Sequence, residues 1–235
     1  MSNLNNSETI IKLDNISYNR NRKIILKKIN FELSSENFIL MTGQNGSGKS
    51  TLLQIIAGLL KPDSFDLYYK QGMQRNKSWL AAKKYLRQKF CYLHQTPYLF
   101  SGTVYDNIAY GLKQQGLNRS EIDNKVKDAL KLIDLQHLCN RNSHALSGGE
   151  KQRVAIARSW VIQPAFILLD EPFANMDKHS RSSTYDIINQ LKEDNIGVVL
   201  TSHDPHSGEL AFNRHMHLHL GDMIEKNLKH ITHIT

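Results

Sequence analysis

One stretch of the sequence has the residue types and the spacing needed to hold phosphate groups. It covers residues 43–50 and matches the pattern G-x-x-x-x-G-K-[ST] in full. Its glycines let consecutive backbone N–H groups turn toward phosphate oxygens, and the N-terminus of a following helix adds a dipole that favours the anion. We expect Lys49 to reach the β- and γ-phosphates of a nucleotide and Ser50 to ligate Mg²⁺. The predicted nucleotide-binding residues here are Gly43, Gln44, Asn45, Gly46, Ser47, Gly48, Lys49, Ser50 and Thr51.

Two consecutive acidic residues follow an apolar run later in the chain. Residues 166–169 are apolar, and Asp170 and Glu171 come directly after them. In nucleotide hydrolases with a phosphate-binding loop, an aspartate at the end of such a strand holds Mg²⁺. A carboxylate at the next position is well placed to polarise the water that attacks the γ-phosphate. An ordinary acidic turn before Pro172 is the alternative, which the loop at residues 43–50 makes less attractive.

A third motif, LSGGEKQ at residues 146–152, places a serine and two glycines at the start of a predicted helix. This is a second helix N-terminus that could bind phosphate. The alternative is a simple helix cap, since serine is a favoured N-cap residue. The motif resembles the signature sequence of ATP-binding cassette (ABC) ATPases. One chain would then have two helix N-termini that could bind phosphate. The resemblance therefore implies that Ser147, Gly148 and Gly149 contact the nucleotide of a second chain.

The resemblance covers almost the whole chain and implies roles for four more residues. Tyr18 resembles the aromatic residue that stacks on adenine, and a strand aromatic facing the core is the alternative. Gln95 resembles the glutamine that senses Mg²⁺ and the attacking water and links to the membrane partner, and the alternative is a surface glutamine. Asp177 resembles a nucleotide-site aspartate, with Met176 where the family more often has leucine. His203 resembles the switch histidine that contacts the γ-phosphate. The predicted catalytic residues are therefore Glu171, His203 and Gln95, and the predicted metal ligands are Ser50, Gln95 and Asp170.

Alternating strand and helix patterns must position these motifs. Continuous apolar runs at residues 38–41, 166–169 and 198–200 favour parallel strands that are covered on both faces. Helical patterns lie between them, so the fold class is α/β with a P-loop NTPase (RecA-like) core. Residues 11–18 and 24–33 indicate an N-terminal antiparallel β subdomain.

The division of the chain follows from these patterns. We expect a single ABC ATPase domain over residues 1–235. Its core and β subdomain would comprise residues 1–95 and 165–235, and a helical insertion subdomain would cover about 96–164. Phe65 stands where the family usually has glycine, which puts the local turn in doubt but not the catalysis.

Three histidines near the end of the chain raise the question of a metal site. His215, His217 and His219 alternate with apolar residues, so an extended strand would place them on one face before a hairpin turn at Gly221. No acidic or cysteine ligand accompanies them. We therefore expect an exposed strand face here.

The composition limits the class of protein. The chain has 235 residues, a net charge of +8 and 40% hydrophobic residues, which fits a globular protein. It has no apolar run of about 20 residues that would span a membrane and no apolar N-terminal leader. Two cysteines form neither a disulfide framework nor a zinc site, which favours a reducing cytosol. The basic residues are spread out, with the densest patches at residues 20–28 and 75–89, and favour a solvated surface over a nucleic-acid arm.

The resemblance implies an ATP-binding and ATP-hydrolysing subunit that uses Mg²⁺ and powers a separate membrane permease. It further implies a head-to-tail homodimer around two ATP molecules, a position on the inner face of the cell membrane, and a solute-binding protein as a further partner. A faint similarity to importers of oxyanions such as tungstate, or of polar amino acids, suggests import of a small solute. The alternatives are a soluble ABC ATPase that acts on ribosomes or nucleic acid, and a nucleotide binder with only a scaffolding role. Intact Glu171 and His203 argue against the last, and we expect no nucleic-acid partner.

Overall fold

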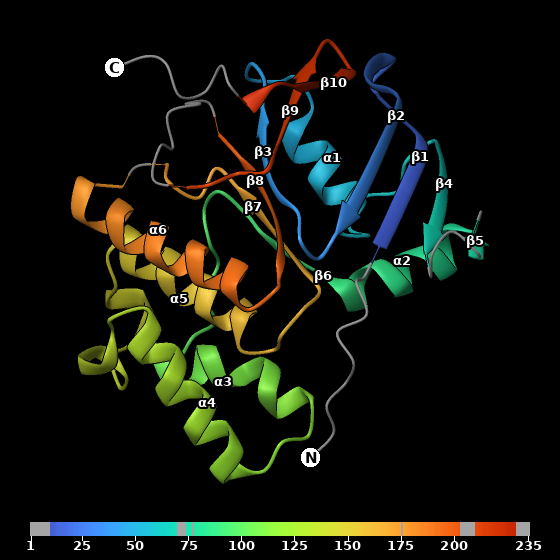
Figure 1. The fold of residues 1–235 in the computed structure, drawn as a ribbon. Helices are drawn as coiled ribbons and strands as arrows, with labels where there is room; N and C mark the ends of the chain where they lie inside the picture. Colours follow the sequence, from blue (N-terminus) through green and yellow to red (C-terminus); the bar gives the residue numbers. More distant parts are fainter. Residues whose placement is uncertain (1–9, 70–73, 77, 175, 203–209, 229–235) are drawn as a thin grey trace.

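Two β-sheets with helices around them make up the described part of the chain (Figure 1). The structure is a computed structural model that describes residues 10–69, 74–76, 78–174, 176–202 and 210–228. Within those ranges no helix has the length and apolar character to cross a membrane.

The larger sheet has six strands in the order β10-β9-β3-β8-β7-β6. Neighbouring strands are parallel except at the hairpin of β9 and β10. Every residue of β3, β7 and β8 is buried, because packed elements cover both faces of the sheet. The strands are β3 (Phe38–Thr42), β6 (Phe90–Leu93), β7 (Phe166–Asp170), β8 (Gly197–Thr201), β9 (Arg214–His219) and β10 (Asp222–Lys226).

The smaller sheet is antiparallel, with the order β2-β1-β4-β5. Its strands are β1 (Ile10–Arg20), β2 (Lys23–Ser34), β4 (Ser64–Tyr69) and β5 (Gln74–Asn76). Asn21 and Arg22 form the two-residue turn between β1 and β2, with φ of 51° and 65°. Positive φ at both residues gives the turn a twist that matches the twist of the two strands.

Six α-helices and two short 3₁₀ turns complete the described residues. Helices α3, α4 and α5 each begin with a capping box, in which the cap side chain and the acid three residues later satisfy each other's backbone N–H groups. The helices are α1 (Lys49–Ile56), α2 (Trp79–Lys89), α3 (Val104–Gln114), α4 (Arg119–Leu132), α5 (Gly148–Trp160) and α6 (Lys178–Glu193), and the turns are Gln136–Leu138 and Ser143–Ala145.

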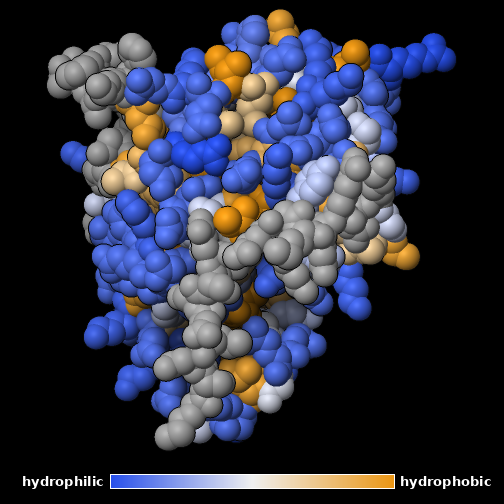
Figure 2. Space-filling view, turned by 45° about the vertical axis from the view of Figure 1, so that its right-hand side comes forward, coloured by the Kyte–Doolittle hydropathy of each residue, from blue (hydrophilic) through white to orange (hydrophobic). Residues whose placement is uncertain are grey.

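Alternate residues of the central strands enter two separate cores. In β3, Phe38 and Leu40 pack with α3 to α6, whereas Ile39 and Met41 pack with α1, α2 and the smaller sheet. Figure 1 shows α1 between the two sheets and α5 and α6 together on the opposite face. The six-stranded sheet is therefore the middle layer, and on the face in Figure 2 hydrophobic residues form small separate spots among hydrophilic ones.

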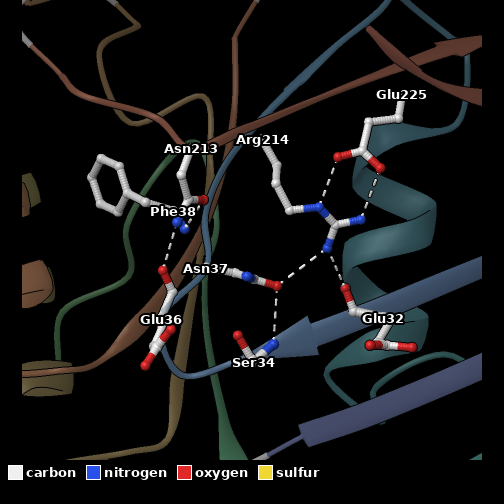
Figure 3. A network of polar contacts seen from close by, with 8 residues as sticks. All are labelled: Glu32, Ser34, Glu36, Asn37, Phe38, Asn213, Arg214 and Glu225. Carbon is white, nitrogen blue, oxygen red and sulfur yellow. Dashed lines mark hydrogen bonds and ion pairs between the residues drawn. The ribbon is translucent and has the colours of Figure 1, made fainter. Parts of the chain in front are cut away.

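A polar network fastens β9 to the loop before β3 (Figure 3). Arg214 donates to both carboxylate oxygens of Glu225 at 2.9 and 3.1 Å, and to the carbonyl oxygen of Glu32 at 2.7 Å. Asn213 exchanges hydrogen bonds with the backbone of Phe38 at 2.9 Å. Because these contacts hold the start of β9, they set its register on β3.

The predicted α/β class and the N-terminal antiparallel hairpin are confirmed. Strands β4, β5 and β6 and helix α2 were not predicted, because their segments have no clear apolar period. The turn at Phe65 is held without a glycine: Asp63 donates its backbone N–H to the Ser17 carbonyl at 2.8 Å, and its carboxylate accepts from Asn19 at 2.7 Å. The Phe65 ring packs edge-on against the Trp79 ring, with 5.4 Å between the two ring centres.

The expectation for the three histidines was partly wrong. They do alternate along β9, and a hairpin turn does follow. However, His215 is only 6% exposed and His217 is half-buried, and a ring nitrogen of each lies within hydrogen-bond distance of Thr42 on the neighbouring strand β3. No group of three metal-ligating side chains occurs among the described residues, so a metal site at this strand has no support.

Candidate nucleotide-binding site

The loop between β3 and α1 forms a cradle of backbone groups. Gly43 has a φ of 152°, and a Cβ atom there would lie 2.3 Å from the carbonyl oxygen of Leu218. Gly48, the residue before α1, has a φ of 108° and is crowded by Ile25 and Leu26. Only glycine fits these two positions, because a side chain would meet both an unfavourable backbone conformation and a neighbouring strand.

A cleft of about 440 Å³ opens over this loop. It brings together residues from the loop, the β1–β2 hairpin and the ends of β6 and β7. Its lining residues are Arg20, Ile25, Asn45, Gly46, Gly48, Lys49, Ser50, Thr51, Gln95 and Glu171. Eight of these ten were predicted from the sequence, and Arg20 and Ile25 were missed.

Lys49 is the buried cation of the cleft. Its side chain is 5% exposed, and its Nζ donates to the carbonyl oxygens of Gly43 at 2.7 Å and Gln44 at 3.3 Å. Burial lowers the pKa of Lys49, while the charges of Glu171 and Asp170 oppose that shift. Its Nζ lies 3.9 Å from the Glu171 carboxylate. The amine is therefore held at the loop, next to the acidic pair.

Asp170 is buried and held by two hydroxyl groups. Thr201 donates to its Oδ1 and Tyr92 to its Oδ2, both at 2.8 Å. Burial is the main cause that raises the pKa of Tyr92, so this hydroxyl remains a donor at physiological pH. The carboxylate thus has a fixed orientation at the carboxyl end of β7.

Glu171 lies one residue further, at the surface of the cleft. Its φ is 50°, in the left-handed region that few residues other than glycine adopt. Its backbone N–H donates to the Thr201 hydroxyl at 2.9 Å, and Gln95 donates to its carboxylate at 3.5 Å. Backbone strain of this kind is common at functional sites, where the surrounding structure holds it in place.

Two predicted residues, Tyr18 and His203, are not found among the described residues of the cleft. Tyr18 is half-buried and packs against the core of the smaller sheet, and it does not line the cleft. His203 lies outside the described residues. Arg20 lies two residues after Tyr18, in the dense basic stretch at residues 20–28, and that charge was the one signal that could have identified it.

The LSGGEKQ motif stands apart from this cleft. Ser147 caps α5 and is exposed together with Gly148, whereas Gly149 is buried with its Cα against the Ser180 side chain. Asp177 caps α6 by accepting from the Ser180 N–H at 2.8 Å. The two helix starts therefore meet at Ser180, and none of the motif residues lines the chain's own cleft.

The residues of the cleft fit a nucleotide triphosphate and Mg²⁺. The Ser47 hydroxyl is buried and has no hydrogen-bond partner among the described residues, which leaves a donor for a phosphate oxygen. Lys49 supplies a positive charge. The exposed Ser50 hydroxyl and the Glu171 carboxylate in the cleft, and the Asp170 carboxylate buried next to Glu171, offer the oxygen atoms that Mg²⁺ prefers.

Comparison with known proteins points to the same chemistry. A family model described as ABC transporter matches residues 26–174. The molybdate/tungstate import ATP-binding protein WtpC of Pyrococcus abyssi is 43% identical to this chain. The match covers 67% of this chain and 44% of the length of WtpC. The energy-coupling factor transporter ATP-binding protein EcfA1 of Leuconostoc mesenteroides is 32% identical over 86% of this chain and 74% of its own length.

A solved structure agrees over nearly the full chain. The cbiO1 protein of Clostridium perfringens, described as part of the ABC transporter complex cbiONQ, superposes with a TM-score of 0.82 at 31% identity. The match covers 95% of this chain and 90% of the cbiO1 chain. Because the family model, the curated relatives and the solved structure all agree with the motifs of the cleft, the chain belongs to the ABC transporter family, as one of its ATP-binding ATPase subunits.

Proposed function

We propose that this chain binds ATP with Mg²⁺, hydrolyses it, and thereby powers import of a small solute through a separate membrane permease. The observation that carries the proposal is the cleft in which Lys49, Gln95 and Glu171 converge over the glycine loop. Phosphoryl transfer to water depends mainly on positioning and charge stabilisation, and this cleft offers both.

Each residue of the cleft has a definite part in this chemistry. The loop N–H groups and Lys49 would hold the β- and γ-phosphates, and the Ser47 hydroxyl would donate to a phosphate oxygen. Mg²⁺, when bound, would neutralise phosphate charge, held by Ser50, Asp170 and Gln95. Arg20 adds a second positive charge at the rim of the cleft.

Glu171 is the proposed general base. Its backbone is anchored to Thr201 and its carboxylate lies within reach of Gln95 and Lys49. A carboxylate so placed would orient a water molecule toward the γ-phosphate and accept its proton. His203 would contact the γ-phosphate from the end of β8.

ATP would be sandwiched in a head-to-tail homodimer. Ser147 and Gly148 are exposed at the start of a 13-residue helix but do not line the chain's own cleft. A second chain would therefore supply these residues and Gly149, with Asp177 beside them, to the nucleotide. Tyr18 would stack on adenine after a local movement out of its packed position.

The permease would dock on the aromatic surface made by Tyr98, Phe100 and Tyr110, all three of which are exposed. The ring centre of Phe100 lies 5.9 Å from that of Tyr98 and 4.6 Å from that of Tyr110. The Arg158 guanidinium lies 5.0 Å from the same Phe100 ring centre. Exposed aromatic side chains next to an arginine are typical of binding surfaces between proteins. This surface follows Gln95 along the chain, within the helical subdomain proposed at about 96–164, so docking would reach the nucleotide directly. The chain would thus lie on the inner face of the cell membrane.

The solute is proposed to be an oxyanion such as tungstate or molybdate, delivered by a solute-binding protein. The support is the name of the WtpC relative, which is a molybdate/tungstate importer component.

The test is to purify the tagged chain from native membranes in mild detergent and identify its companions. Recovery of a multispanning protein is expected, and Phe100→Ala should release it, whereas the control Leu80→Ala, at an exposed leucine of α2, should not. Recovery of ribosomes or DNA instead would overturn the transport proposal in favour of a soluble ABC ATPase, an alternative with which the net charge of +8 is compatible.

A further inference from the structure

Three polar side chains lie together beneath the start of the glycine loop. Thr42 is the last residue of β3, and its Oγ1 lies 2.8 Å from His215 Nε2 and 2.9 Å from His217 Nδ1. Thr42 and His217 are direct partners in the parallel register of β3 and β9. Thr42 and His215 are 7% and 6% exposed, so water contributes little to this cluster.

The number of hydrogen atoms decides the direction of these bonds. A threonine hydroxyl has one hydrogen to donate, so one ring nitrogen accepts it and the other must donate to the oxygen. His215 Nδ1 is buried and has no partner among the described residues. A bare nitrogen there costs less than an N–H group without an acceptor. His215 therefore carries its proton on Nε2 and donates to Thr42, which donates to His217 Nδ1, so His217 also carries its proton on Nε2.

We infer that Thr42, His215 and His217 form a one-directional hydrogen-bond relay that positions the entrance of the nucleotide-binding loop. The inference rests on the proposed ATP-binding function. None of the three lines the cleft, so they are positioning residues.

The link from the relay to the nucleotide is short. Gly43 directly follows Thr42, and its carbonyl oxygen holds the Lys49 amine at 2.7 Å. Gly43 also lies so close to Leu218 of β9 that no Cβ atom would fit between them. A shift of Thr42 relative to β9 would therefore move the carbonyl that orients Lys49.

Burial and the surrounding charges favour the neutral form of both rings. Burial lowers the pKa of His215 and of His217, and the charges of Lys226 on β10, of the neighbouring histidines and, for His217, of Lys49 act in the same direction. Protonation of either ring leaves one buried donor without an acceptor: the Thr42 hydroxyl when His217 is charged, or Nδ1–H when His215 is charged. The relay is thus intact at neutral pH and is lost as the pH falls through the pKa of either ring, which lies below the ordinary histidine value of about 6.5.

The direct test is nitrogen-15 NMR of the histidine rings in the full chain at about pH 7.5. Signals assigned with His215→Gln and His217→Gln are expected to show that both rings are Nε2–H tautomers. An Nδ1–H tautomer at either ring would overturn the relay. This result does not depend on ATP, so it separates a failure of the relay from a failure of the proposed function.

Binding of a fluorescent ATP analogue tests the positioning role. Thr42→Val keeps the side-chain volume and removes the hydroxyl, and it is expected to weaken binding about fivefold at pH 7.5, the equivalent of one net hydrogen bond. Thr42→Ser should bind within about twofold of the wild type. The ratio of dissociation constants, Thr42→Val over wild type, should fall toward one as the pH is lowered through the pKa of the two histidine rings, because the wild-type relay is then broken too.

The control is His137→Gln, since His137 is exposed in the 3₁₀ turn Gln136–Leu138 and lies outside the relay. This variant should follow the wild type at every pH tested. A Thr42→Val variant that binds as tightly as the wild type, or a ratio that does not change with pH, would overturn the positioning role even if its melting temperature falls. A wild-type chain that binds no ATP analogue would instead contradict the proposed function.

Discussion

The Thr201 hydroxyl joins the two acidic residues of the site, and removing it should have a large effect. It donates to Asp170 at 2.8 Å and accepts from the Glu171 N–H at 2.9 Å, and Thr201 is fully buried. Thr201→Val keeps the β-branched shape but loses both bonds. A bond to a buried carboxylate contributes about 2 kcal/mol, and an orphaned backbone N–H costs about 1 kcal/mol more. We expect the free energy of unfolding to fall by about 3 kcal/mol.

Urea denaturation and steady-state ATP hydrolysis measure the two consequences. With a slope of about 2 kcal/mol/M, the unfolding midpoint should fall by about 1.5 M. Turnover should fall by more than about tenfold, because the strained backbone of Glu171 loses its anchor. Thr184→Val is the matched control: this buried hydroxyl in α6 bonds to the Ser180 carbonyl of its own helix, and its loss should cost less than about 1 kcal/mol. A midpoint for Thr201→Val that equals that of the control would refute the reasoning.

The remaining predictions concern the base, the loop and a distant ion pair. Glu171→Gln should keep ATP binding, lose turnover by at least about 100-fold and accumulate as an ATP-bound dimer in size-exclusion chromatography, and hydrolysis at the wild-type rate would exclude Glu171 as the base. Gly43→Ala should abolish ATP binding, because its Cβ would lie 2.3 Å from the Leu218 carbonyl; normal binding in equilibrium dialysis would contradict the cradle geometry. Hydrogen bonds from Arg214 lower the pKa of Glu225 below 4.5. Glu225→Gln should therefore reduce the free energy of unfolding, measured by urea denaturation, by less than about 1 kcal/mol at pH 7. This reduction should vanish as the pH falls through the lowered pKa of Glu225. A loss that stays constant down to pH 3 would show that charge plays no part.

Much of the cleft could be predicted because its key groups are contiguous in the chain. A phosphate-binding loop needs successive backbone N–H groups and the N-terminus of a helix. Residues 43–51 supply all of these groups within one turn and the start of one helix. The acid pair is likewise two neighbours at the end of one apolar strand. Seven of the ten residues lining the cleft were identified in this way, and Gln95 was identified through the family resemblance.

The partners of those residues were not predictable, because they come from other strands. Tyr92 on β6 and Thr201 on β8 hold Asp170 only because β6, β7 and β8 are adjacent, and strand order is a property of the whole sheet. The expectation for His215 failed for the same reason: the alternation predicted that the three histidines share one face, but not that Thr42 of the neighbouring strand β3 meets two of them.

The α/β class, the phosphate loop, the acidic pair and the family could all be predicted from the amino-acid sequence, because each depends on local spacing or on a short apolar run. Other features became visible only in the fold: Arg20 reaches the cleft while Tyr18 packs against the core, Thr201 and Tyr92 orient Asp170, and Thr42 meets two histidines. Hydrogen bonds between strands depend on which strands are neighbours and in which register. That arrangement results from the burial of all the apolar faces together, and no single segment encodes it.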